Sequence, residues 1–185
     1  MALLPEPGQW GEQDYLWLTS HTNHLVELVD GHIEELPMPT EKHQAISLYL
    51  VFAFHALMQR MGGKVFYAPL RLRLRSGRFR EPDLILLRSA DDPRRQNDYW
   101  RGADLVLEVV SPDDPKRDHV DKRADYAQAS IPEYWIVDPQ TETITVLHLA
   151  GAHYAEHGVF GRGATASSVL FADFSVNVDA VLDAD

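Results

Sequence analysis

The sequence predicts an α/β fold in which helices flank a mixed β-sheet, and two observations predict it. Residues 104–110 have the pattern of a buried strand, residues 118–129 that of a helix and residues 133–137 that of a second strand, which together make a βαβ unit with a parallel strand pair. The hairpin turn sequences Asp30-Gly31 and Ser76-Gly77 precede this unit, so we expect antiparallel strands beside the parallel pair.

The other elements follow from local patterns along the chain. Helices are expected where apolar residues recur every three or four positions, and strands where they alternate or run without interruption. In chain order we expect a helix over 12–19, strands over 24–30 and 31–36, a helix from its cap Thr40 to about Met61, strands over 65–75 and 78–87, a loop over 88–101, and short strands with glycine turns over 143–178. Residues 1–10 are expected to be a loose lead-in to a single domain spanning residues 1–185.

The composition excludes several classes of protein. With 45% hydrophobic and 24% charged residues the chain is globular, and its net charge of −11 excludes a wholly basic nucleic-acid coat. The absence of cysteine excludes disulfide frameworks, thiolate zinc sites and iron–sulfur clusters. No apolar run approaches the roughly 20 residues that span a bilayer, and the N-terminus lacks the features of a signal peptide, so we expect a cytoplasmic protein without a membrane segment.

An acidic residue interrupts or opens each of two apolar strand sequences. Glu108 lies within the run 105–110, which is typical of a strand covered on both faces, and Asp83 opens the run 84–87. Each acid has a structural alternative, because Glu108 could face water or pair with an arginine and Asp83 could bond the backbone where its strand begins. Two carboxylates on neighbouring strands also suit Mg²⁺, which is held by one or two carboxylates with water and phosphate oxygens. The pair therefore indicates a site for phosphoester chemistry.

Asp118, Lys122 and Tyr126 are spaced four residues apart and share one face of the helix expected over 118–129. One interpretation is a weak surface ion pair between Asp118 and Lys122. The other directs the Lys122 ammonium toward the two acids, where it would orient water or stabilise the charge that develops on a phosphate. Spacing alone does not choose between them.

An ordered series of motifs resembles the PD-(D/E)XK nucleases, and more narrowly the Uma-type putative restriction endonuclease family, long catalogued as a domain of unknown function. The motifs are the hairpin over 26–33, Glu81-Pro-Asp-Leu, Leu107-Glu-Val-Val-Ser-Pro, the helical residues Asp118, Lys122 and Tyr126, and the segment 131–139. They cover most of the chain. The resemblance implies a restriction endonuclease-like PD-(D/E)XK core flanked by helices, and a Mg²⁺- or Mn²⁺-dependent endonuclease that hydrolyses DNA.

The resemblance also implies roles for individual residues. Asp83 and Glu108 would bind the metal, and Val109 would lend its backbone carbonyl. The superfamily's usual lysine position, two residues after the second acid, holds Val110 here. In the Uma-type family the lysine is thought to come from the helix, so Lys122 matches the catalytic lysine.

Residues around this core would support it. Glu27 matches an acid of the opening hairpin that would contact metal or water, and Glu41 is a weaker rival for that role. His43 would support the site from behind the metal ligands, as would Asp118 and Tyr126. A purely structural role, which is commoner for a histidine at the start of a helix, is the alternative for His43. A homodimer is expected by analogy, because cutting both strands often needs two active sites.

A local cluster of positive charge offers a route to DNA. Residues 71–80 contain five arginines and no acid, and Arg71, Arg73 and Arg75 share one face of the expected strand. Guanidinium groups suit bidentate contact with phosphate, so these three are candidate DNA-binding residues. A charged outer face that discourages aggregation of an edge strand is an equal alternative.

The main alternative to an endonuclease is a catalytically inactive module on a nuclease fold that binds nucleic acid or protein. Val110 at the usual lysine position and the acidic net charge favour it. A weaker alternative is a small-molecule phosphoesterase that uses the same metal site.

Overall fold

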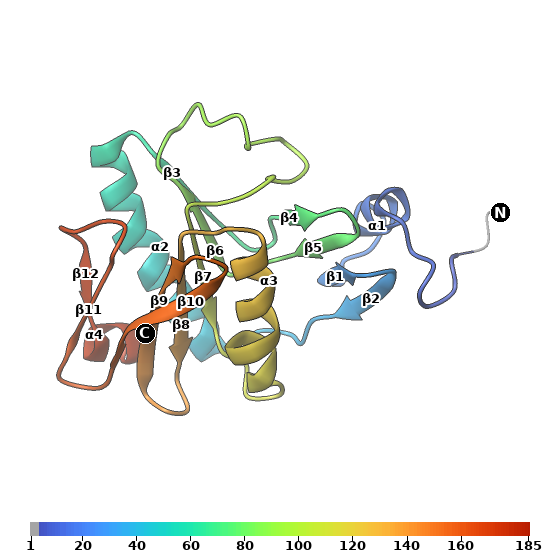
Figure 1. Cartoon of the computed structure of the whole chain (residues 1–185). Helices are drawn as coiled ribbons and strands as arrows, with labels where there is room; N and C mark the ends of the chain where they lie inside the picture. The colour runs from blue at the N-terminus through green and yellow to red at the C-terminus, as the bar shows by residue number, and fades with distance from the viewer. Residues whose placement is uncertain (1–3) are drawn as a thin grey trace.

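The computed structural model describes residues 4–185 and contains a six-stranded mixed sheet with helices on both faces (Figure 1). The strand order is β10-β9-β8-β7-β6-β3, and only the pair β7 and β8 is parallel. The strands of this sheet are β3 (Lys64–Tyr67), β6 (Leu84–Leu87), β7 (Leu105–Val109), β8 (Glu133–Asp138), β9 (Thr143–Ala150) and β10 (His153–Phe160). The predicted α/β fold with a mixed sheet is confirmed.

Strand β7 lies inside the sheet, between β8 and β6, as its apolar sequence predicted. After β7 the chain forms the π-helical segment η1 (Arg117–Lys122) and helix α3 (Arg123–Gln128), and returns in β8 parallel to β7. The βαβ unit is therefore confirmed. The helix predicted over 118–129 begins with π-helical geometry, which residue spacing does not distinguish from an α-helix.

Helix α2 (Glu41–Met61) covers one face of the sheet, and η1 and α3 cover the other (Figure 1). Thr40 caps α2 by accepting the His43 backbone N–H, and Gly62 ends it with a φ of 75°, a conformation that favours glycine.

The side chains of β7 alternate between these two faces. Leu105, Leu107 and Val109 belong to the apolar core under α2, whereas Val106 and Val110 belong to the core on the side of α3. Glu108 lies two residues from both Val106 and Val110, so its side chain points to the same face of the sheet as theirs and faces α3.

A second sheet has four strands in the order β2-β1-β5-β4 and packs beside α1 (Glu12–Thr19). Its strands are β1 (Val26–Val29), β2 (His32–Glu35), β4 (Leu72–Arg75) and β5 (Arg78–Arg80). Asp30 and Gly31 have φ values of 48° and 84°, the two positive values that the predicted type I′ turn requires.

The hairpin predicted over 65–75 and 78–87 is wrong as a single unit, because each of its arms divides between the two sheets. Strands β3 and β6 pair in the large sheet, whereas β4 and β5 pair in the small one. Pro69 and Pro82 lie at the division in the two arms. A proline has no N–H to donate to a ladder, which explains why the pairing is interrupted there.

The C-terminal region differs from the short strands predicted over 143–178. Strands β9 and β10 have eight residues each and form a hairpin, while β11 (Thr165–Ser167) and β12 (Ser175–Asn177) are short. Sequence prediction missed α4 (Val178–Leu182), a short helix whose cap Asn177 accepts the Ala180 N–H at 2.9 Å.

The segment expected to be a loose lead-in is described from residue 4 onward, and residues 1–3 lie outside the described part. The backbone N–H groups of Gly8 and Trp10 both donate to the carbonyl oxygen of Gly31, which anchors this end of the segment to the β1–β2 turn. Within residues 4–185, no helix has the length and apolar character needed to cross a membrane.

Candidate active site

Asp83 and Glu108 lie at the end of the sheet where strand β6 begins and its antiparallel neighbour β7 ends. The antiparallel register pairs Leu84 with Leu107, so extending it by one residue places Asp83 opposite Glu108. Directly opposed residues have Cβ atoms about 4.5–5.5 Å apart and lie on the same face of a sheet. The Val109 backbone N–H also donates to Asp83 Oδ2 at 2.7 Å, which ties Asp83 to β7.

Both acids line a cavity of about 210 Å³ that lies between the sheet, the start of α2 and η1. Its polar lining consists of Thr40, His43, Gln44, Glu81, Asp83, Glu108, Ser111, Asp114, Arg117, Asp118 and Lys122. Its apolar lining consists of Leu25, Leu36, Pro37, Met38, Pro39, Ala68, Pro69, Val109 and Pro112. Charged and apolar groups are therefore combined in one hollow.

Lys122 directs its ammonium at Glu108. The Nζ atom lies 2.9 Å from Glu108 Oε2, 3.2 Å from Asp118 Oδ1 and 3.9 Å from Glu27 Oε1, and the residue is 4% exposed. Burial lowers the pKa of Lys122, but the charges of Glu108, Asp118 and Glu27 outweigh it and raise the pKa far above its ordinary value. Lys122 is a buried, charged group of the cavity and not half of a surface ion pair.

Glu108 is held by two donors from the helical side of the site. Its Oε2 faces Lys122, and its Oε1 accepts the hydroxyl of Tyr126 at 2.5 Å. Burial raises the pKa of Glu108, and the nearby charges of Asp118 and Asp83 raise it further, against the opposing charge of Lys122. An additional positive charge close to Glu108 would therefore stabilise the ionised form of its carboxyl group.

His43, in the first turn of α2, contacts the other acid. Its Nε2 lies 3.2 Å from Asp83 Oδ2. Burial lowers the pKa of His43, but the hydrogen bond to Asp83 and the charge of that carboxylate outweigh it, and the pKa is raised. The Asp83 carboxylate is thus held between an imidazole and the Val109 N–H.

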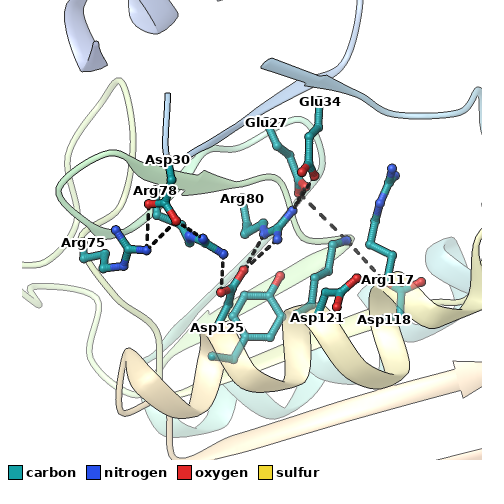
Figure 2. Close-up of polar contacts among 12 residues, drawn as sticks. Glu27, Asp30, Glu34, Arg75, Arg78, Arg80, Arg117, Asp118, Asp121 and Asp125 are labelled. Carbon is teal, nitrogen blue, oxygen red and sulfur yellow. Dashed lines mark hydrogen bonds and ion pairs between the residues drawn. The ribbon is translucent and has the colours of Figure 1, made fainter. Parts of the chain in front are cut away.

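Glu27 lies behind Lys122 and does not line the cavity. It is fully buried, and its Oε2 accepts from Arg80 Nη1 at 2.6 Å (Figure 2). Its Oε1 accepts the Glu81 backbone N–H at 2.9 Å. Its rival Glu41 is exposed at the start of α2 and is also outside the lining. Of the two acids, Glu27 is the one in contact with the cluster.

The donor set suits a hard divalent cation. Within residues 4–185, no three histidine, aspartate or glutamate side chains are arranged to hold a metal ion by themselves. Asp83 and Glu108 both line the cavity and offer a smaller, all-oxygen set, and Mg²⁺ usually completes such a set with water and substrate phosphate oxygens. The residues present therefore fit a cation that is shared with a phosphate substrate.

Comparison with known proteins gives the family. The sequence pattern of the Uma2 family, described as "Putative restriction endonuclease", matches residues 12–179. The protein belongs to the Uma2 family. The family assignment predicted from the sequence motifs is confirmed.

The fold of this Uma2 chain is shared with a crystal structure of a putative nuclease belonging to DUF820 from Anabaena variabilis. The TM-score is 0.72 at 20% sequence identity, and the match covers 91% of this chain and 97% of that chain. The restriction endonuclease-like fold that the resemblance implied is therefore confirmed. Among curated proteins, none matches the chain.

The three arginines expected to contact DNA have partners within the Uma2 chain. Arg73 forms a bidentate pair with Glu12, Arg75 pairs with Asp30, and Arg71 donates to backbone carbonyl oxygens. None of the three lines the cavity, and Arg71 precedes β4 and does not belong to its face. Their contact with DNA stays a prediction.

Sequence reasoning assigned no individual role to Glu81, Arg80 or Arg117. Glu81 lines the cavity at 6% exposure, and its Oε2 is buried without a hydrogen-bond partner among the described residues. Burial and the charge of Glu27 raise the pKa of Glu81 to about 7. Arg80 and Glu81 directly precede the Pro82-Asp83 motif, so charges at the entrance of a buried strand were the available signal. For Arg117 the only signal was its position beside Asp118.

Proposed function

We propose that this protein is a divalent-metal-dependent endonuclease that hydrolyses phosphodiester bonds of DNA. The observation that carries the proposal is the convergence of Asp83, Glu108 and Lys122 on one cavity. Two carboxylates and a positively charged donor are the groups that metal-assisted hydrolysis of a phosphodiester needs. Membership of a family of putative restriction endonucleases supports the same reaction. A homodimer would supply the two sites needed to cut both strands.

Each residue would have a distinct part in this reaction. Asp83, Glu108 and the Val109 carbonyl would hold Mg²⁺ or Mn²⁺, which when bound lowers the pKa of water and neutralises phosphate charge. Lys122 keeps an ammonium beside Glu108, where it can orient water or donate to a phosphate oxygen. Asp118 and Glu27 fix that ammonium.

The direct test is cleavage of supercoiled plasmid in Mg²⁺ or Mn²⁺, with EDTA as the control. Nicking that EDTA abolishes is the expected result, and calorimetric titration should detect Mn²⁺ binding. Failure on plasmid, single-stranded DNA and RNA, together with absence of Mn²⁺ binding, would instead support a catalytically inactive module, which Val110 at the usual lysine position favours. Hydrolysis of a generic phosphodiester without DNA cleavage would indicate a small-molecule phosphoesterase.

Replacing His43 by alanine should weaken Mn²⁺ binding by about 10–100-fold, because partners that orient a metal-binding carboxylate have effects of this size. His43 contacts Asp83 at 3.2 Å and lines the cavity. His55→Ala is the matched control, since His55 is exposed on the same helix and lies outside the cavity. Calorimetry would measure the Mn²⁺ affinity of both variants. Equal Mn²⁺ affinity of His43→Ala and His55→Ala would contradict the proposal that His43 orients the Asp83 carboxylate for metal binding.

A further inference from the structure

Three basic side chains line the cavity, and two of them are already engaged. Lys122 contacts three carboxylates, and His43 contacts Asp83. Arg117 differs, because within residues 4–185 its one ion pair is a 3.7 Å contact between its Nε and Asp114 Oδ2, which is longer than a hydrogen bond. Its guanidinium makes no hydrogen bond to the described residues, so its donors are available to a ligand.

The position of Arg117 suits an anionic ligand. The residue begins η1 and directly precedes Asp118, so the segment that places Lys122 beside Glu108 also places Arg117. Its side chain is 19% exposed and extends away from the helix (Figure 2). Its partner Asp114 is 49% exposed, and such a long, partly solvated ion pair opens at little cost.

The charge of the cavity favours an additional basic side chain that is not already paired with a carboxylate. Five carboxylates line it: Glu81, Asp83, Glu108, Asp114 and Asp118. They would repel a phosphodiester unless positive charge faces the entering phosphate. The carboxylates around Lys122 offset its charge, whereas Arg117 offers planar donors that match phosphate oxygens in bidentate geometry.

We propose that Arg117 is the phosphate-binding residue of this cavity, and that its guanidinium exchanges Asp114 for a non-bridging oxygen of a nucleic-acid phosphodiester. The inference rests on the proposed function, since it assigns the residue that holds the substrate in the same site.

The test compares Arg117→Gln with Lys116→Gln, which removes the same charge one residue away. Lys116 is a suitable control because its side chain is 70% exposed, pairs with Asp121 and lies outside the cavity. Fluorescence anisotropy would measure binding of a labelled DNA oligonucleotide, with Ca²⁺ in place of Mg²⁺, over a range of salt concentrations. Arg117→Gln should weaken binding by about 10–100-fold, the effect of losing a hydrogen bond to a charged group.

The salt dependence identifies a phosphate contact. The slope of log affinity against log salt should become shallower by about one in Arg117→Gln and stay unchanged in Lys116→Gln. Arg117→Lys should restore the slope and only part of the affinity, because it restores charge without the bidentate geometry.

Three results would overturn the inference: equal losses in Arg117→Gln and Lys116→Gln, an unchanged slope in Arg117→Gln, or a wild type that does not bind the oligonucleotide. Plasmid nicking in Mg²⁺ decides the proposed function separately. Nicking by the wild type with unimpaired binding by Arg117→Gln would reject the inference and leave the endonuclease standing. Selective loss of DNA binding in Arg117→Gln, without any nicking by the wild type, would support Arg117 as the phosphate-binding residue and reject the endonuclease.

Discussion

Replacing Lys122 by alanine should lower the rate of metal-dependent DNA cleavage by about 10²–10³-fold, the usual effect of removing one preorganised charged donor. The ammonium lies 2.9 Å from Glu108 Oε2 and is held there by Asp118. Val110 cannot replace it, because its side chain is apolar and packs in the core on the α3 side of the sheet. Single-turnover cleavage in saturating Mn²⁺ would measure the loss without a contribution from product release.

The stability of this variant has to be measured beside its rate. Removing the ammonium leaves Glu108, Asp118 and Glu27 close together in a buried site, which by itself costs stability. Circular dichroism at the assay temperature, with and without Mn²⁺, separates loss of chemistry from loss of fold.

The arginine variant and a surface control sharpen the assignment. Lys122→Arg should recover part of the rate, since it restores charge and not geometry. Lys116→Gln, at an exposed position, should cleave like the wild type. A folded Lys122→Ala that cleaves at the wild-type rate would remove Lys122 from the chemistry.

The sequence reveals Glu108 because it breaks a local pattern, whereas the resemblance to the family's helical motif singles out Lys122. A carboxylate inside an apolar strand needs a partner, and the helical spacing of Asp118, Lys122 and Tyr126 supplies one, which the 2.9 Å contact realises. Asp83 was identified in the same way, but its place opposite Glu108 depends on the register of β6 against β7. A long loop separates these strands, so no local pattern fixes that register.

Contacts between distant segments explain what sequence reasoning missed. Arg80 joins Glu27 and Asp125, which are 53 and 45 residues away in the chain, and hairpin or helix spacing does not encode such pairs. The division of one expected hairpin between two sheets has the same origin, because alternation within a strand does not say which neighbour pairs with it. The partners of Arg73 and Arg75, which are Glu12 and Asp30, also come from other elements, so alternation along the strand predicts a charged face without showing that these two arginines are paired.

Replacing Arg80 by methionine should lower the free energy of unfolding by about 3–5 kcal/mol at neutral pH, the cost of leaving buried charges without their partner. Arg80 is 2% exposed, and its guanidinium lies 2.6 Å from Glu27 Oε2 and 2.7 Å from Asp125 Oδ2 (Figure 2). These pairs connect β5 with β1 and with α3, and they hold Glu27 behind Lys122. Arg75→Met is the control, because the pair of Arg75 with Asp30 is 41% and 50% exposed and should contribute less than about 1 kcal/mol.

The pH dependence of Arg80→Met distinguishes loss of a charge partner from loss of packing. In the wild type, burial raises the pKa of Glu27, but the charges of Lys122 and Arg80 outweigh it and hold the pKa below its ordinary value. A carboxyl group whose pKa is lowered by folding stabilises the folded state at pH values above its pKa in the unfolded state. That contribution is lost as the pH falls through its pKa in the folded state. Without Arg80, less positive charge opposes the effect of burial, so the pKa of Glu27 rises. Glu27 then becomes protonated at a higher pH than in the wild type, and protonation removes the unpaired buried charge. Denaturant unfolding should therefore show the gap between wild type and Arg80→Met narrowing as the pH falls from about 7 to about 4. A gap that stays constant over this range would mean that Arg80 stabilises the protein by packing alone, and that it does not set the charge of Glu27 behind Lys122.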